Sequence, residues 1–146
     1  MKVWIFDLDG TLTIEDGDAI KPFSAAAALN ALASPLIEVA KAVEKPDKLI
    51  ILTARTTDLK KVTVKWLRAQ IGHSNFSLIM REPNVPLRAI PFFKVREIAE
   101  IKNKLKPEAL VFYEDSEANL HQARQHYTGD ETVELIQVEL GKIKRQ

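Results

Sequence analysis

The chain has no cysteine among its 146 residues, which excludes disulfides, thiolate metal sites and a cysteine nucleophile. No apolar run approaches the ~20 residues needed to cross a bilayer, so a membrane span is excluded. Net charge is nearly absent, with 21 Lys and Arg against 20 Asp and Glu, which argues against a protein that coats DNA. Met1 leads directly into an apolar segment and not into a signal peptide. We therefore expect a cytoplasmic protein without membrane contact.

The chain does have the size and the hydrophobic content, 46%, of one ordinary domain, so we expect residues 1–146 to form a single domain. Five short apolar runs are candidate strands: residues 3–6, 49–52, 77–80, 109–113 and 134–140. Helical patterns alternate with them: residues 58–71, residues 93–105, and two short helices within 25–42 divided at Ser34-Pro35. This alternation predicts a doubly wound α/β domain, a three-layer sandwich around a five-stranded, mainly parallel sheet. Its ligands should bind at the carboxyl ends of the strands.

Charge is distributed unevenly along the chain. Residues 1–20 contain five acidic residues and one Lys, whereas residues 81–106 contain seven basic and three acidic residues. An acidic site beside a basic segment fits metal-assisted phosphate chemistry, although a solvated helix face also looks basic.

The strongest local signal is the string FDLDGTLT at residues 6–13. A strand period of two places Asp7 and Asp9 on the same side, and Gly10 permits a sharp turn directly after them. Two neighbouring carboxylates repel each other unless a divalent cation with oxygen ligands lies between them. A bare Asp-X-Asp is more often a solvated loop, but the full string indicates a cation site.

Three further motifs follow in order: LTAR at residues 52–55, FFKVREI at 92–98 and FYEDSEANL at 112–120. Together with FDLDGTLT they resemble the four motifs of the haloacid dehalogenase-like (HAD) superfamily of phosphohydrolases. The resemblance covers residues 3–120. It implies a HAD-like phosphatase that cleaves a phosphate monoester.

By this resemblance, Asp7 is the nucleophile that becomes an aspartyl phosphate, and Asp9 is the acid and base for the leaving group and for water. Thr53 and Lys94 neutralise and orient the transferring phosphoryl group. Each of the latter two also has a plainer interpretation, because a strand-end Thr often caps a helix and a lone helical Lys is usually solvated.

The resemblance also implies Mg²⁺ as the cofactor. The Asp7 carboxylate, the Asp9 backbone carbonyl and the Asp115 carboxylate are its expected ligands. Glu114 and Asn119 depart mildly from the common family pattern. We interpret Glu114 as a direct or water-mediated ligand and Asn119 as a residue that orients Asp115 or a water.

Arg55 and Arg81 are the candidate substrate-binding residues. Arg55 follows Thr53 by two residues and can offer a phosphate its bidentate fork, with an exposed salt bridge as the rival interpretation. The segments between the first three motifs are short, which predicts no large cap and an open site. An open site admits a macromolecular end, and capped relatives usually enclose small metabolites.

Within the superfamily, the strings LTAR, FFK and YEDSEANL look like the RNA-repair-like branch and the phosphatase domain of polynucleotide kinases. Ile90 stands where the phage group of these kinases usually has an Asp, and the chain contains no P-loop. The resemblance implies a phosphorylated substrate, with a nucleic-acid end as one candidate partner. A small-molecule (nucleotide or sugar) phosphatase, a catalytically idle binding module and a phosphoacceptor domain are the alternatives, and the intact Asp9 favours hydrolysis.

Overall fold

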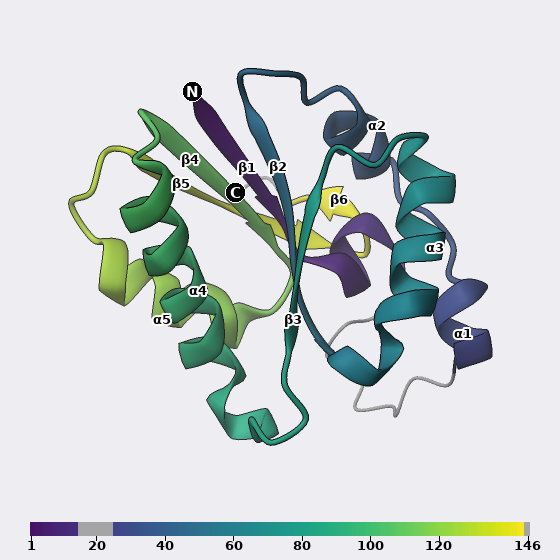
Figure 1. Cartoon of the computed structure of the whole chain (residues 1–146). Helices are drawn as coiled ribbons and strands as arrows, with labels where there is room; N and C mark the ends of the chain where they lie inside the picture. Colours follow the sequence, from purple (N-terminus) through teal and green to yellow (C-terminus); the bar gives the residue numbers. More distant parts are fainter. Residues whose placement is uncertain (15–24, 145–146) are drawn as a thin grey trace.

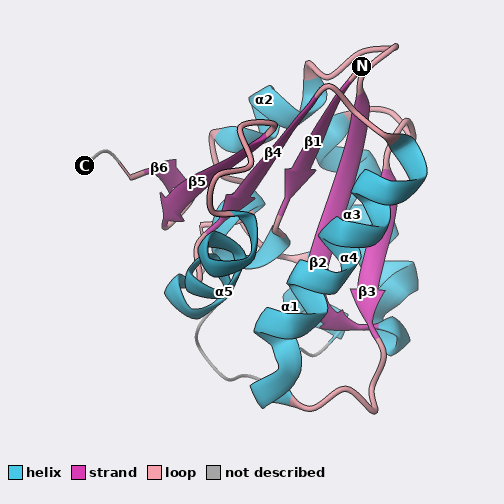
Figure 2. Ribbon diagram, turned by 90° about the vertical axis from the view of Figure 1, so that its left-hand side faces the viewer, coloured by secondary structure: helices cyan, strands magenta, loops and turns pink. Residues whose placement is uncertain are grey.

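Six strands form one mostly parallel sheet in the computed structural model, which describes residues 1–14 and 25–144. The strands are β1 (Lys2–Phe6), β2 (Lys48–Thr56), β3 (Ser77–Arg81), β4 (Ala109–Glu114), β5 (Val133–Glu139) and β6 (Lys142–Ile143). Their order is β3-β2-β1-β4-β5-β6; β1 to β5 pair in parallel and β6 pairs antiparallel with β5 (Figure 2). Three acidic residues of the N-terminal segment, Glu15, Asp16 and Asp18, lie outside the described residues.

Helices cover both faces of the sheet. They are α1 (Ala25–Leu29), α2 (Leu36–Lys41), α3 (Lys60–Ile71), α4 (Ile90–Leu105) and α5 (Glu117–Tyr127), with a π-helical turn at Leu8–Leu12 and 3₁₀ turns at Thr57–Leu59 and Leu87–Ala89. Figure 1 shows α1, α2 and α3 on one side of the sheet and α4 and α5 on the other. The described residues contain no large cap, and none of their helices is long and apolar enough to span a bilayer.

Each face of the sheet has its own apolar core. Strand alternation sends Ile5 of β1 to the core shared with Ile98 of α4, whereas Phe6 packs in the opposite core with Trp66 of α3. Because both faces are covered, the central strands each contain a continuous apolar run: Val3–Phe6, Leu49–Leu52 and Leu110–Tyr113. Trp66 is therefore a core residue, and Trp4 packs against the same cluster.

The sequence predicted five strands, and the structure corrects this number to six. Beyond the predicted strand at residues 134–140, Lys142–Ile143 pairs with β5, and the Gly141 N–H donates to the Gly10 carbonyl over 3.0 Å. A strand of two residues is too short to show alternation, which is why the pattern missed it.

The predicted helices all form, but α3 begins at Lys60 and not at residue 58, and α5 was not among the predictions. A further difference is the start of α4. This helix begins at Ile90 and not at residue 93, because Pro91 occupies the first turn, where its missing N–H costs no hydrogen bond. The two short helices predicted within residues 25–42 are α1 and α2. The Ser34 hydroxyl accepts a hydrogen bond from the Leu36 N–H over 3.2 Å at the start of α2.

Candidate active site

Asp7 lies at the carboxyl edge of the sheet, directly after the central strand β1. The last residue of β1, Phe6, pairs with Ile51 of β2 and with Tyr113 of β4. The Asp7 N–H donates to the Tyr113 carbonyl over 2.9 Å, which extends the ladder by one residue. Asp7 is therefore held between the ends of β2 and β4, where its side chain is almost buried.

The chain turns sharply after Asp9, as the glycine in the motif predicted. Gly10 has a φ of +83°, which L side chains rarely adopt. The Gly10 N–H donates to Thr13 Oγ1 over 3.1 Å, and the Thr13 N–H donates to the Leu8 carbonyl over 3.1 Å. These bonds close the turn Leu8–Leu12 upon itself.

Two distant segments hold this turn from outside. Ser34 donates its hydroxyl to the Thr11 carbonyl over 2.5 Å and its N–H to the Leu12 carbonyl over 2.8 Å. Gly141, between β5 and β6, donates its N–H to the Gly10 carbonyl. A Cβ on Gly141 would lie 2.4 Å from the Ser34 Cβ, so only glycine fits here. The C-terminal hairpin thereby braces the turn that carries Asp9.

Replacing Gly141 by Ala should lower the free energy of unfolding more than replacing Gly129 by Ala. Both glycines have positive φ, which costs about 1 kcal/mol for an alanine, but a Cβ on Gly129 meets nothing within 4 Å. The clash with Ser34 should cost Gly141→Ala about 1–3 kcal/mol more. Urea unfolding of the two variants measures the difference, and equal losses would show that the hairpin contact is loose.

Lys94 of α4 connects the carboxylates of the site. Its Nζ lies 2.8 Å from Asp7 Oδ1, 2.6 Å from the Leu52 carbonyl and 3.5 Å from Glu114 Oε1. The side chain is 1% exposed, so the interpretation of Lys94 as a solvated helical residue is wrong. Asn119 of α5 donates to Glu114 Oε1 from the other side.

The protonation of this cluster follows from burial and charge. Burial acts to raise the pKa of Asp7, but the Lys94 ammonium and hydrogen bonds within the cluster hold this pKa below its ordinary value. Burial acts to lower the pKa of Lys94, yet the charges of Asp7 and Glu114 outweigh burial and raise it. Burial and the charge of Asp7 raise the pKa of Glu114 well above its ordinary value, against the effect of Lys94. These directions favour the ionised form of Asp7 and the neutral form of Glu114.

Three carboxylates of the site can hold a metal ion. Asp7, Glu114 and Asp115 each offer one oxygen, and these oxygens all lie within 4.8 Å of one another. Lys94 brings a single positive charge to these three carboxyl groups. Carboxylate oxygens are hard donors of the kind that Mg²⁺ and Ca²⁺ take, so the donor set fits a divalent cation.

Arg55 of β2 is bound to Asp9. Its Nε and Nη2 donate to the two carboxylate oxygens of Asp9 over 2.9 and 2.7 Å, and its Nη1 donates to Thr63 Oγ1 of α3 over 3.2 Å. The salt bridge that rivalled substrate binding in the sequence does form, but it is buried, with the Arg55 side chain 1% exposed. Asp9 is therefore fixed in one orientation by a two-point ion pair.

The other two residues that the sequence assigned to the site, Thr53 and Arg81, lie on the neighbouring strands β2 and β3. Thr53 is buried within β2, where its Oγ1 accepts a hydrogen bond from the Arg55 N–H over 3.1 Å, so it does not cap a helix. Arg81 donates from Nε to the Ala54 carbonyl over 2.9 Å and from Nη1 to the Val85 carbonyl over 2.6 Å. Arg81 thus ties the loop before α4 to the end of β2.

Sequence reasoning missed two hydroxyls of the site. Thr11 donates to Asp7 Oδ2 over 3.2 Å, and its place within the FDLDGTLT string was a signal that could have identified it. Thr63, the second partner of Arg55, lies on a helix face with no motif around it. Its role becomes apparent only once α3 is packed against the sheet.

Neither protein-family models nor curated protein sequences match this chain. Among solved structures, it is similar to chains in two structures of the Pnkp1/Rnl/Hen1 RNA repair complex, with 23% identity in each. The TM-scores are 0.68 and 0.67, and each match covers 94% of this chain but only 42% and 45% of the other. The chain therefore shares a fold with these proteins and spans less than half of their length.

Proposed function

We propose that this chain is a single-domain HAD-like phosphatase that hydrolyses a phosphate monoester with the help of Mg²⁺. One observation carries the proposal: Asp7 lies at the centre of the sheet edge, bound by Lys94, with Asp9 in the turn two residues later. Two further carboxylates lie beside Asp7, the buried Glu114 and the partly buried Asp115, and this arrangement would be costly if the site had no charged ligand. The order of the four motifs along the chain supports the same conclusion.

The residues of the chain divide the reaction between them. An Asp7 carboxylate oxygen attacks phosphorus while the bond from phosphorus to the leaving oxygen breaks. Asp9 acts here in its protonated form, with one oxygen turned away from Arg55, and gives its proton to the leaving oxygen. Asp9 then takes a proton from water, the water oxygen attacks phosphorus, and the Asp7 carboxylate leaves. Phosphate and an alcohol are released, and both aspartates return to their first states.

Charge neutralisation comes from Lys94 and from the metal site. Lys94 holds Asp7 in place from one side, and Thr53 lies near the end of the neighbouring strand to orient the phosphoryl group. When Mg²⁺ is bound, it neutralises the phosphoryl oxygens and the carboxylates together. Asp7, Asp115 and the Asp9 carbonyl would hold it. Glu114 already accepts from Asn119 and from the Asp115 N–H, so we assign it mainly to shaping the metal site.

A polynucleotide end is the substrate that we propose. The described residues leave the site without a large cap, and the fold is shared with proteins of an RNA repair complex. The segment that supplies Lys94 carries an excess of basic residues, which would attract the remaining phosphates of a chain. A panel of nucleotides, sugar phosphates and oligonucleotides with 3′- or 5′-phosphates tests this assignment. Faster hydrolysis of a small metabolite than of every oligonucleotide would replace it with a small-molecule phosphatase.

Magnesium should raise the melting temperature of the wild-type chain and should be needed for turnover. Binding to the folded state alone stabilises it by about 2.7 kcal/mol at a hundredfold excess over Kd, which corresponds to several degrees. Asp115→Asn removes a ligand and should lose most of this shift, whereas Asp58→Asn, an exposed residue at the start of the α3 region, should keep it. Thermal melts with Mg²⁺ and with chelator measure the effect. Undiminished hydrolysis in excess chelator would contradict the metal assignment.

Arg55→Met should slow the release of poor leaving groups far more than that of good ones. In this variant Asp9 loses the two contacts that orient it. We assign Asp9 as the acid for the leaving oxygen, and general acid catalysis contributes about 10²- to 10⁴-fold to the rate where the leaving group needs a proton. We expect kcat/KM to fall about 10²-fold or more for an alkyl phosphate and much less for a nitrophenyl phosphate. Arg55→Lys keeps the charge without the fork and should be intermediate. An equal loss with both substrates would mean that Arg55 binds the phosphoryl group itself.

A further inference from the structure

The outer face of α4 carries an exposed aromatic ring at its beginning. Phe92 is 60% exposed, whereas Lys94, two residues later in the same helix, is 1% exposed. A helix rotates about 100° per residue, so these two side chains leave the helix on nearly opposite sides. Lys94 points to Asp7, and Phe92 points to solvent.

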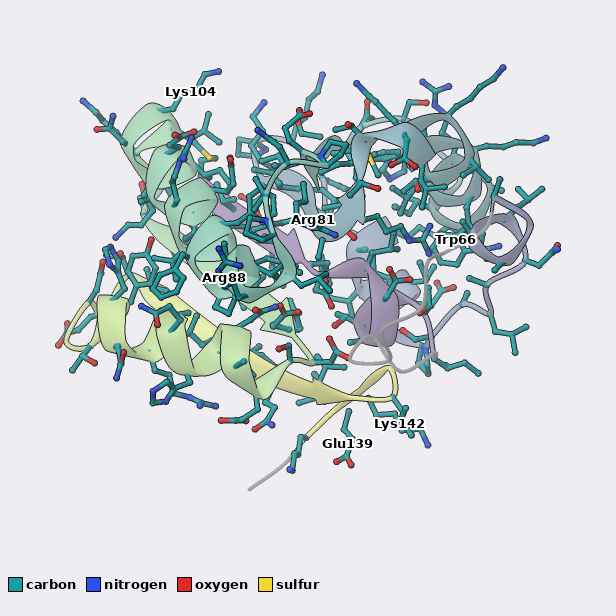
Figure 3. All side chains as sticks on the ribbon, turned by 90° about the horizontal axis from the view of Figure 1, so that it is seen from below. Trp66, Arg81, Arg88, Lys104, Glu139 and Lys142 are labelled. Carbon is teal, nitrogen blue, oxygen red and sulfur yellow. The ribbon has the colours of Figure 1, made fainter. Side chains whose placement is uncertain are left out.

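Two arginines extend this exposed position into a row. Arg96 lies four residues after Phe92 on the same helix face, and Arg88 lies four residues before it in the turn that leads into α4. All three side chains are exposed. Figure 3 views the molecule from below and shows Arg88 at the near end of α4. We call Arg88, Phe92 and Arg96 the α4 row.

The charge of the α4 row is largely uncompensated. The side chain of Arg88 makes no hydrogen bond or ion pair with any residue in the described part of the chain. Arg96 lies 3.7 Å from Glu100, but both side chains are more than half exposed, and such a pair holds the arginine only weakly. The guanidinium groups of Arg88 and Arg96 flank the exposed ring of Phe92, so this row is complementary to a ligand in which anionic groups alternate with flat apolar groups. Nucleic acid has this chemistry: phosphates for the arginines and bases for the ring.

We propose that the α4 row binds single-stranded nucleic acid behind the end that enters the active site, with one base stacked on Phe92. The inference rests on the proposed phosphatase function and adds to it the part of the substrate that does not react. A helix is about 10 Å across with its side chains, and Lys94 lies against the reacting centre on the inner side. The ring on the outer side therefore meets nucleotides beyond the terminal one, and the row supplies binding energy remote from the reaction.

The selectivity between a phosphorylated oligonucleotide and a nitrophenyl phosphate tests the ring. Phe92→Ala should lower the ratio of kcat/KM for the oligonucleotide to that for the aryl phosphate by about 5- to 150-fold, the value of one base stack. The loss should lie in KM, and Phe92→Trp should restore the ratio. Leu32→Ala changes an equally exposed side chain, at 62%, in the loop between α1 and α2, and should leave the ratio unchanged. An unchanged ratio in Phe92→Ala would overturn the proposal.

Salt dependence tests the two arginines. Each single-strand phosphate that is neutralised contributes a slope of about −0.7 to log K against log salt. Arg88→Ala and Arg96→Ala should each make the slope for the oligonucleotide less steep by roughly that amount, and Arg68→Ala, an exposed arginine on α3, should not. Slopes that are identical in all four proteins would contradict the assignment.

A binding measurement separates this proposal from the proposed function. A fluorescent oligonucleotide without a terminal phosphate is titrated with the wild-type chain and with Phe92→Ala in chelator, and anisotropy is recorded. Weaker binding by Phe92→Ala supports the α4 row even if the chain hydrolyses nothing. Hydrolysis of oligonucleotides with equal binding by both proteins refutes the row and leaves the phosphatase standing. Tighter binding of a phosphopeptide than of the oligonucleotide would also refute it.

Discussion

Asp7→Asn should abolish phosphatase activity while the chain remains folded. The amide keeps the shape of the carboxylate but is a far poorer nucleophile, so kcat/KM should fall by roughly 10³-fold or more. The melting temperature should change little. Asn can still accept a hydrogen bond from Lys94 or from Thr11, and losing one of several neighbouring negative charges relieves repulsion. Hydrolysis of a nitrophenyl phosphate and a thermal melt of the same preparation measure both effects.

Asp58→Asn is the matched control for this variant. Asp58 is exposed in the 3₁₀ turn after β2, so its change removes one negative charge near the same edge of the sheet without touching the cluster. It should keep wild-type activity. If Asp7→Asn retained more than about a tenth of the wild-type kcat/KM, Asp7 would not be the nucleophile.

Lys94→Met should cost both stability and activity. The variant leaves Asp7 and Glu114 buried at the sheet edge without the ammonium that compensates them. Removing one partner of a buried ion pair typically costs about 3–5 kcal/mol, which for a chain of this size lowers the melting temperature by about 10 °C or more. Activity, measured well below the melting temperature of the variant, should fall because Asp7 loses its orienting contact.

Lys102→Met separates this effect from a general loss of lysine. Lys102 lies on the same helix and also forms an ion pair, with Asp130, but its side chain is 26% exposed. A partly exposed pair of this kind should contribute no more than about 1 kcal/mol. A loss of stability as small for Lys94→Met as for Lys102→Met would show that the buried carboxylates do not depend on Lys94.

The strands of the sheet could be predicted because strands that are buried on both faces appear in the sequence as continuous apolar runs. Runs such as residues 49–52 are continuously apolar, as is typical of strands that are covered on both faces. The end of β2 has no such apolar run. The strand continues to Thr56 through an irregular register with β3 between Thr53 and Thr56, and these residues are polar. The pattern therefore placed the end of this strand four residues too early.

The candidate site could be predicted as a set of residues but not as a set of contacts. Asp7 and Asp115 follow strands whose ends meet at one edge of a parallel sheet, so their approach follows from topology. The pair of Arg55 with Asp9 joins residues that are 46 positions apart, and spacing does not determine which way each side chain points. Arg55, which the sequence assigned to substrate binding, therefore forms an ion pair with the Asp9 carboxylate.

The phosphoryl group on Asp7 is the most direct test of the proposed mechanism. Asp9→Asn keeps the nucleophile but lacks the base that activates water, so an aryl phosphate with a good leaving group should phosphorylate it and the product should accumulate. The variant is mixed with this substrate and Mg²⁺, quenched in acid, digested and mapped by mass spectrometry. We predict one added phosphoryl group, on the peptide that contains Asp7 and on that residue. A phosphoryl group on another residue, or wild-type release of phosphate with no phosphorylated residue in either protein, would contradict the account.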